Sequence, residues 1–242
     1  MNKTISSWRQ RLYRQFSLML ANQPKLGYYL QPLLHWNKPQ WHPDYHSASV
    51  VDFCWETEQI LSVWLKPAAS WSGFTPGQHI LVTLLHQGRY ISRSFSISSS
   101  AACFAQQKQI RISCRIQPQG EFTKALASGV SGLTELSISD AMGDFVLAPN
   151  ADSTELTSTV MVAAGSGITP LWSMLSSIRC WTSPVVLFYS VKNAAQAAFL
   201  AELKLLAAKQ PLFELRLIET EITGRLNLIQ DLATKADFSM TQ

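Results

Sequence analysis

The strongest constraint on the fold is the pattern after residue 155, where apolar runs alternate with stretches of helical character. The run Val185–Val191 is almost entirely apolar, which is typical of a strand buried on both faces of a sheet. Strands that alternate with helices form parallel, doubly wound sheets. Residues 151–242 are therefore expected to form such a domain. Its other strands are expected at Thr159–Ala164 and Phe213–Ile218, and its helices near Pro170–Ile178, Ala194–Lys209 and Leu226–Ala233.

Residues 47–150 have a different pattern, in which short segments alternate apolar and polar side chains. Turn signals such as Pro76-Gly77 and Gln87-Gly88 separate these segments. One short helix is expected at about Glu121–Ala127. Six short strands with one helix predict a six-stranded antiparallel barrel, so that the whole chain is a two-domain β plus α/β protein. The strands are expected at Val50–Trp55, Ile60–Lys66, His79–Leu85, Ser92–Ser98, Gln109–Ile116 and Glu135–Ser139.

Residues 1–46 are expected to form a basic, helical or irregular extension. The first 44 residues carry six lysines and arginines against one acid, Asp44, whereas the whole chain has a net charge of only +4. The remaining residues thus have no excess of positive charge, which argues against a general affinity for nucleic acid. No apolar run approaches the roughly 20 residues that a transmembrane helix needs, and a cytoplasmic protein is predicted.

Residues 1–22 have apolar side chains at helical spacing, with arginines mostly elsewhere on the helix. This pattern leaves two alternatives open. The helix packs against the barrel with solvated arginines, or it makes a peripheral contact with an anionic membrane surface. The apolar positions are Ile5, Trp8, Leu12, Phe16 and Met19.

The four cysteines are far apart in the sequence, and no pair has the spacing of a metal or iron–sulfur motif. Buried free thiols are expected, and no metal site is predicted in this chain. Likewise, the sequence shows no Ser-His-Asp arrangement that would indicate a hydrolase.

The chemistry-bearing motifs follow one another in a defined order. The segment RYISRSFSISSS (89–100) contains Arg93-Ser94-Phe95-Ser96. It follows PGQHILV (76–82) and precedes CRIQPQGEFTKAL (114–126), GDFVL (143–147) and GSGITP (165–170). In this order the motifs resemble the ferredoxin–NADP reductase superfamily, in particular its oxygenase- and desaturase-reductase-like members, over about residues 47–234.

The resemblance implies a flavin site on the barrel. Arg93 matches the arginine that holds the FAD pyrophosphate, for which a guanidinium fork is well suited. Phe95 stands where the family has an aromatic residue, usually tyrosine, against the flavin, and Ser96 matches the catalytic serine near flavin N5. Gly120 and Thr123 lie at a helix start whose N–H groups favour phosphate. Two alternatives remain open for Arg115: it supports a phosphate, or it is a solvated strand arginine.

The resemblance also implies a nicotinamide site at the GSGITP turn, where glycines let the backbone approach the nucleotide. A proline in the first helical turn costs little, because no N–H is needed there. Ser190 and Lys192 can bind a 2′-phosphate, and no acid stands beside them to select a free ribose hydroxyl, so NADPH is slightly favoured over NADH. The residues of the turn are Gly165, Ser166, Gly167, Thr169 and Pro170.

The implied activity is transfer of hydride from NAD(P)H to FAD, followed by single-electron transfer to a ferredoxin-type acceptor serving an oxygenase or desaturase. The [2Fe–2S] centre is expected on a missing domain or a partner. The family continues, after the segment that resembles residues 223–232, into a strand ending in Cys-Gly-Pro, which this sequence lacks. The sequence is therefore expected to be part of a longer reductase, or a truncated form with impaired activity and with Thr159–Ala164 as an exposed edge. The alternative function is a non-catalytic flavin-binding module.

Overall fold

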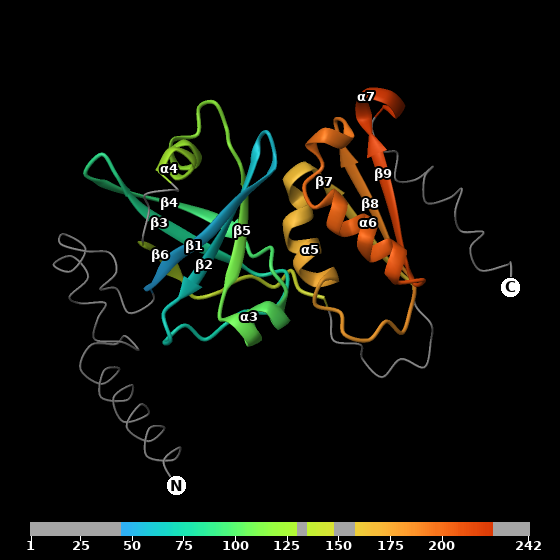
Figure 1. Ribbon diagram of the computed structural model, residues 1–242, viewed down its shortest axis with the longest axis horizontal. Coiled ribbons are helices and arrows are strands. Elements are labelled where there is room, and N and C mark those ends of the chain that lie inside the picture. The colour runs from blue at the N-terminus through green and yellow to red at the C-terminus, as the bar shows by residue number, and fades with distance from the viewer. Residues whose placement is uncertain (1–44, 130–134, 148–157, 225–242) are drawn as a thin grey trace, which may run out of the picture.

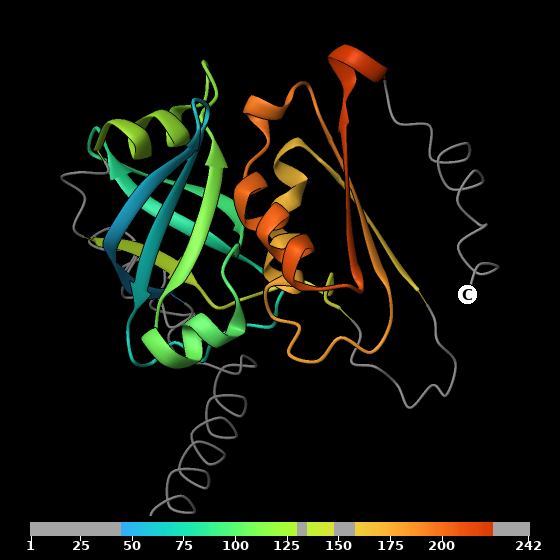
Figure 2. The same cartoon turned by 45° about the vertical axis from the view of Figure 1, so that its right-hand side comes forward.

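The computed structural model describes residues 45–129, 135–147 and 158–224. They form two units that lie side by side, a barrel and an α/β domain (Figures 1 and 2). The expected N-terminal helix and the expected helix Leu226–Ala233 lie outside the described residues. No helix in these three ranges is long and apolar enough to cross a membrane.

The first unit is a six-stranded antiparallel sheet in the order β4-β3-β6-β1-β2-β5. A bridge between Ile97 and Ile112 joins its two edges, and the N–H of Ser98 donates to the carbonyl of Arg111 at 2.7 Å. The sheet therefore closes into the predicted barrel. Its strands are β1 (Tyr45–Thr57), β2 (Ile60–Pro67), β3 (His79–His86), β4 (Arg89–Ser96), β5 (Ile110–Arg115) and β6 (Glu135–Ser139).

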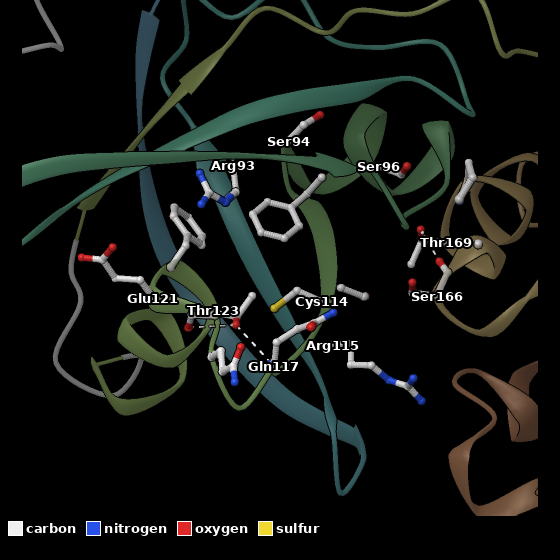
Figure 3. Close-up of a pocket in the computed structure, with 17 residues that line it drawn as sticks. Arg93, Ser94, Ser96, Cys114, Arg115, Gln117, Glu121, Thr123, Ser166 and Thr169 are labelled. Carbon is white, nitrogen blue, oxygen red and sulfur yellow. Dashed lines mark hydrogen bonds between the residues drawn. The ribbon is translucent and has the colours of Figure 1, made fainter. Parts of the chain in front are cut away.

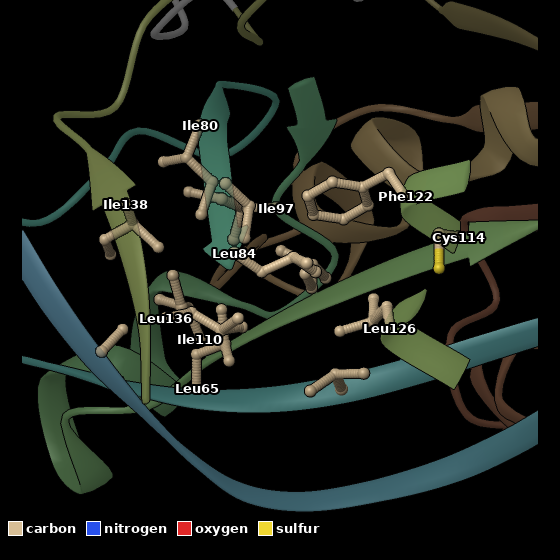
Figure 4. Packing of buried hydrophobic residues seen from close by; sticks show 14 of the residues in the cluster. Leu65, Ile80, Leu84, Ile97, Ile110, Cys114, Phe122, Leu126, Leu136 and Ile138 are labelled. Atoms are coloured by element: carbon tan, nitrogen blue, oxygen red, sulfur yellow. The ribbon is translucent and has the colours of Figure 1, made fainter. Parts of the chain in front are cut away.

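Apolar side chains at alternate positions of the strands fill the interior of the barrel. On β5, Ile110, Ile112 and Cys114 belong to the core cluster, whereas Arg111 and Arg115 point to the outside. Fully burying an aliphatic side chain contributes about 1.5–3 kcal/mol, so these positions dominate the stability of the barrel. Figure 4 shows the packing of Leu65, Ile80, Leu84, Ile97, Ile110, Cys114, Phe122, Leu126, Leu136 and Ile138.

The barrel carries two helices where the sequence predicted one. The predicted helix is α4 (Glu121–Gly129), and the additional one is α3 (Ala101–Gln107). The hydroxyl of Ser100 caps α3 by accepting from the N–H of Cys103, and Lys108 ends it with φ +56°. The prediction missed α3 because the helix has only seven residues and none of them is fully buried, so it shows no apolar periodicity.

The second unit contains the parallel sheet β7-β8-β9, in the predicted strand positions β7 (Thr159–Ala164), β8 (Val185–Val191) and β9 (Phe213–Glu219). Helices α5 (Ile168–Leu175) and α6 (Leu200–Lys209) lie between this sheet and the barrel (Figures 1 and 2). A short helix, α7 (Thr220–Thr223), follows β9. The apolar cluster of this unit includes Ile60 of the barrel, so the two units share packed surface.

The expected helix Ala194–Lys209 is interrupted in the structure. Residues Ala194–Gln196 form a 3-10 turn, η3, and α6 begins only at Leu200. Between them Phe199 has φ +59° and is buried against Trp172, with ring centroids 6.0 Å apart. The left-handed backbone at Phe199, held by packing of its ring, therefore separates η3 from α6.

Strand β7 lies at one edge of the three described parallel strands. Met161 and Ala163 are buried, whereas Val160 and Val162 are 47% and 43% exposed. The expected apolar edge is thus present in the described part of the chain.

Candidate functional site

A cavity of about 730 Å³ lies between the barrel and the α/β domain. This volume is within the range of small-molecule and cofactor sites, about 300–1,000 Å³. Strands β4 and β5 and helix α4 form one wall, and the turn before α5 forms the other (Figure 3). The cavity brings together ten residues that the motifs predict, namely Arg93, Phe95, Ser96, Arg115, Gly120, Thr123, Ser166, Gly167, Thr169 and Pro170.

The motif on β4 supplies the upper wall in Figure 3. Arg93 is exposed, and its Nη1 atom donates to the carbonyl of Ser92 at 2.8 Å. The Phe95 ring lies 5.3 Å from the ring of Phe122 on α4, which packs the strand against the helix. A charged group and an aromatic surface therefore stand side by side on the same strand face.

The start of α4 forms a second part of this wall. The Thr123 hydroxyl donates to the Gly120 carbonyl at 3.4 Å, and it accepts from the N–H of Gln117 at 3.3 Å. A Cβ at Gly120 would lie only 2.6 Å from that hydroxyl oxygen, so a larger residue would displace the Thr123 side chain. Glu121 stands in the first turn of α4 and forms an ion pair with Arg89. The positive end of the helix dipole thus faces the cavity.

Arg115 extends from β5 toward the α/β domain. Its Nη2 atom donates to Oε1 of Gln196 at 3.2 Å. Its Nε atom is buried and has no hydrogen-bond partner in the described part of the chain. A buried donor without a partner is costly, and an anion in the cavity would satisfy it. Arg115 is half-buried, and its unpaired Nε atom favours the phosphate-supporting alternative, which stays a prediction.

The GSGITP turn forms the opposite wall. Gly165–Gly167 make a 3-10 turn, η2, between β7 and α5, with φ +51° at Gly165. No protein atom lies within 4 Å of a Cβ built at Gly165 or Gly167, so the backbone is open to a ligand. The Thr169 hydroxyl donates to the Ser166 carbonyl at 3.0 Å. Pro170 stands in the first turn of α5, as predicted.

Three predicted site residues do not line the cavity: Gly165, Ser190 and Lys192. Ser190 and Lys192 lie at the end of β8, where Ser190 is half-buried and Lys192 is exposed. The segment around them carries no acid, but two acids approach from later elements: Glu219 pairs in register with Val191, and the N–H of Glu221 donates to the carbonyl of Lys192 at 3.1 Å. The Glu219 carboxylate accepts from the N–H of Ala194 at 2.7 Å, and the Glu221 carboxylate accepts from Nδ2 of Asn193 at 2.9 Å.

Comparison with known proteins identifies these two units. A family model for an oxidoreductase FAD-binding domain matches residues 49–146, and one for an oxidoreductase NAD-binding domain matches residues 161–227. The NADPH oxidoreductase of Mycobacterium tuberculosis (strain ATCC 25618 / H37Rv) is 34% identical over 198 residues, which are 81% of this chain and 51% of that protein. The chain belongs to the ferredoxin–NADP reductase family.

Two further similarities concern oxygenase chemistry and the fold. Methane monooxygenase component C of Methylosinus trichosporium is 28% identical over 146 residues, 60% of this chain and 40% of that protein. The flavohem-like FAD/NAD binding domain of nitric oxide dioxygenase from Vibrio cholerae O1 biovar El Tor matches with a TM-score of 0.62 at 22% identity, over 72% of this chain and 73% of that one. At 22% identity, this second similarity supports the fold of the chain and not its function. The chain spans about half or less of the length of these two curated relatives.

The cavity suits the FAD of the ferredoxin–NADP reductase family. Arg93 and Arg115 supply two guanidinium groups, and the start of α4 supplies a helix N-terminus, all on one wall. The partnerless Nε atom of Arg115 and the open backbone at Gly165 and Gly167 mark places where a ligand would complete the protein's contacts. A pyrophosphate and a nicotinamide nucleotide have the charge and shape for these two walls.

The sequence interpretation missed several lining residues of this reductase-family cavity. Ser113 and Cys114 of β5 contribute to the wall, and Gln117 and Gln119 contribute from the turn before α4. The polar alternation of Arg111, Ser113 and Arg115 on β5 could have indicated this face. Burial raises the pKa of the Cys114 thiol to about 12, so this cysteine stays protonated at neutral pH.

A hydrogen-bonded Ser-His-Asp set, unexpected from the sequence, lies outside the cavity. His46 Nδ1 lies 3.1 Å from the Ser70 hydroxyl, and His46 Nε2 lies 3.0 Å from Asp140 Oδ1. None of the three lines the cavity, and together they join β1, the loop after β2 and the end of β6. Their contacts hold these barrel segments together. The described residues contain no group of histidine, cysteine or acidic side chains that could hold a metal ion.

Proposed function

We propose that this chain takes hydride from NAD(P)H onto FAD and passes the electrons singly to an iron–sulfur, ferredoxin-type acceptor that serves an oxygenase or desaturase. The observation that carries this proposal is the cavity between the two domains, because the flavin motif on β4 and the nicotinamide motif before α5 face the same space. When bound, FAD accepts two electrons as hydride and can release them one at a time.

The residues of the barrel wall bind and orient the flavin in this proposal. Arg93 and Arg115 neutralise the pyrophosphate, together with the N–H groups at the start of α4 and the hydroxyl of Thr123. The Phe95 ring supplies an apolar surface for the flavin, without the hydroxyl of the more usual tyrosine. Ser96 directs its hydroxyl to the reacting edge of the flavin and is the proposed catalytic residue.

The residues of the opposite wall admit the nicotinamide nucleotide. The turn Gly165–Gly167 lets the backbone approach the nucleotide, and Thr169 and Pro170 line the space that faces the flavin. Ser190 and Lys192 extend this binding surface beyond the cavity toward the adenosine 2′ position. The nature of the Methylosinus relative, a component of a monooxygenase, supports an oxygenase as the final destination of the electrons.

Anaerobic mixing of the FAD-loaded protein with NADPH or NADH tests this function. We expect the visible flavin absorbance to bleach. A flavin that binds but stays oxidised with both nucleotides would instead identify the chain as a non-catalytic flavin-binding module.

The Ser96→Ala variant tests the proposed catalytic residue. We expect reduction to slow by about 100-fold, the order of magnitude for loss of a preorganised hydrogen-bond donor, while FAD remains bound. Ser128→Ala on the exposed side of α4 is the matched control and should reduce at the normal rate. Equal rates in all three proteins would exclude this role for Ser96.

A further inference from the structure

A buried arginine lies where the barrel meets the nucleotide domain. Arg111 on β5 is only 5% exposed. Its Nη1 atom lies 3.4 Å from Oε1 of Glu56 and 3.3 Å from Oε1 of Glu202. Glu56 belongs to β1 of the barrel, whereas Glu202 belongs to α6 of the nucleotide domain. One guanidinium is thus shared by a carboxylate from each domain.

Aromatic rings from both domains also contact this guanidinium. The Arg111 Cζ atom lies 5.2 Å from the ring centroid of Trp64 on β2 and 4.5 Å from that of Phe199, which precedes α6. Both distances are within the range of cation–π attraction. A buried cation is costly unless paired charges and hydrogen bonds compensate it. Separation of the two domains would remove part of that compensation.

The same guanidinium holds the chain segment that continues from Ser96. Its Nε and Nη2 atoms donate to the carbonyl of Ser98 at 3.3 and 3.2 Å. The N–H of Arg111 donates to the hydroxyl of Ser99 at 3.0 Å. Arg111 therefore holds the chain two and three residues beyond Ser96, the proposed catalytic residue in the cavity wall.

The nucleotide domain contacts this segment from its other side. The hydroxyl of Ser173 on α5 donates to the carbonyl of Ser99 at 2.7 Å, and the hydroxyl of Ser177 accepts from the N–H of Ala101 at 3.0 Å. Helix α5 carries Thr169 and Pro170 of the opposite cavity wall in its first turn. The segment after Ser96 thus lies between Arg111 and the helix that builds the nicotinamide side.

We propose that Arg111 is a positioning residue that sets the spacing of the two cavity walls, by pairing with Glu56 and Glu202 across the domain boundary. Hydride transfer requires the reacting atoms to approach to about 3–3.5 Å, and a misplacement of about 1 Å can cost a factor of about 100 in rate. The proposal rests on the proposed function for its effect on rate. Its effect on domain spacing does not depend on that function.

The Glu202→Ala variant is the principal test, since Glu202 is outside the cavity lining, is partly exposed and lies on a helix that accommodates alanine. We expect flavin reduction at saturating NADPH to slow about 10- to 100-fold. FAD affinity and NADPH affinity should change less than about twofold, and the nucleotide–flavin charge-transfer absorbance should weaken. Glu214→Gln is the matched control, because its carboxylate pairs with Arg216 on the same strand, within one domain.

A distance measurement provides a readout that does not require activity. Spin labels at Cys180 in the nucleotide domain and at Tyr90→Cys in the barrel, both at exposed positions, report domain spacing by double electron–electron resonance. Cys54→Ser and Cys103→Ser remove competing thiols. We expect Glu202→Ala to broaden or shift the distance distribution, and Glu214→Gln to leave it unchanged.

The outcomes separate the two proposals. An unchanged distance distribution in Glu202→Ala overturns the positioning role, whether or not the rate falls. A changed distribution with an unchanged reduction rate also overturns it, because the spacing would then not govern hydride transfer. If the protein with Glu202 intact takes up FAD but is not reduced by NADPH or NADH, the proposed function fails, while the distance measurement still decides whether Arg111 fixes the domains.

Discussion

The side-chain Oε2 atom of Glu219 accepts a hydrogen bond from the backbone N–H of Ala194 at 2.7 Å, which joins the end of β9 to the loop after β8. Glu221 follows it and accepts from the Asn193 side chain at 2.9 Å. The N–H of Glu221 in turn donates to the carbonyl of Lys192 at 3.1 Å. Two carboxylates therefore lie against the loop that follows Lys192, the residue proposed to bind a 2′-phosphate.

Removal of one of these charges should shift the preference between the two nucleotides. A carboxylate about 4 Å from another negative charge in water, such as a 2′-phosphate, contributes about 1 kcal/mol of repulsion. We therefore expect Glu221→Gln to raise the ratio of kcat/KM for NADPH to that for NADH by about 2- to 5-fold, as measured by steady-state kinetics. Lys192→Ala should lower the same ratio. A ratio that moves in the same direction in both variants would contradict this arrangement.

Arg93 should dominate the binding of FAD. Loss of a charge-assisted hydrogen bond to phosphate costs about 1.5–3 kcal/mol, so Arg93→Ala should weaken FAD binding by about 10- to 150-fold. Fluorescence titration of the flavin-free protein with FAD measures this change. Lys124→Ala, which removes an exposed positive charge from α4 outside the cavity lining, should bind FAD nearly as tightly as the unchanged protein. Equal losses in the two variants would mean that only overall charge matters.

The strands were predictable because burial imposes a period of two on them. β6 and β7 have the predicted bounds, and alternation of Ile110, Ile112 and Cys114 with polar residues located β5 within one residue at each end. β1 was predicted too short because its first residues, Tyr45 to Ser49, are mostly polar or small and only Ala48 among them is buried. Helix α3 was missed for a related reason, since it buries no residue completely.

The two walls of the site were predictable because each is encoded by consecutive residues, such as Arg93-Ser94-Phe95-Ser96. Arg111 was not, because its partners Glu56 and Glu202 are 55 and 91 positions away in the sequence. The two carboxylates near the loop after Lys192 were missed for the same reason, because Glu219 ends β9 and Glu221 lies in α7. Contacts between elements distant in sequence leave no local pattern to read.

The stability of the protein should fall at alkaline pH. Burial raises the pKa of Cys114 from 9.0 to about 12, and burial also raises the pKa of Tyr189 from 10.0 to about 12. The unfolded chain therefore loses these protons first, and the stabilisation present below pH 9 is lost as the pH rises toward 12.

Calorimetric Tm values between pH 8 and about 11 measure this loss. Tyr189→Phe removes one of the two groups, so its Tm should fall less steeply than that of the unchanged protein. Tyr90→Phe, at an exposed tyrosine, is the control and should leave the slope unchanged. A Tyr189→Phe slope as steep as that of the control would show that this hydroxyl does not contribute.

Residues 1–22 lie outside the described part of the chain. Their two alternative roles, packing against the barrel and contact with a membrane surface, predict opposite results in a vesicle-binding experiment. Arg9, Arg11 and Arg14 would each contribute about 1 kcal/mol near an anionic membrane surface. Packing against the barrel is the alternative that we favour, and β1 offers exposed apolar side chains at Val51, Phe53 and Trp55. Co-sedimentation with anionic vesicles at low salt decides between them.

We expect the full chain and a chain beginning at Ser47 to remain in solution with these vesicles to the same extent. The Tm of the shorter chain does not decide between the alternatives, because that chain also lacks His46 and its contacts with Ser70 and Asp140. The membrane contact would instead be supported if the full chain sedimented with the vesicles and the shorter chain did not. Replacing the three arginines by glutamine should then abolish this sedimentation. The charge dependence is the deciding feature, since attraction to anionic lipid weakens with added salt whereas apolar packing on the barrel does not.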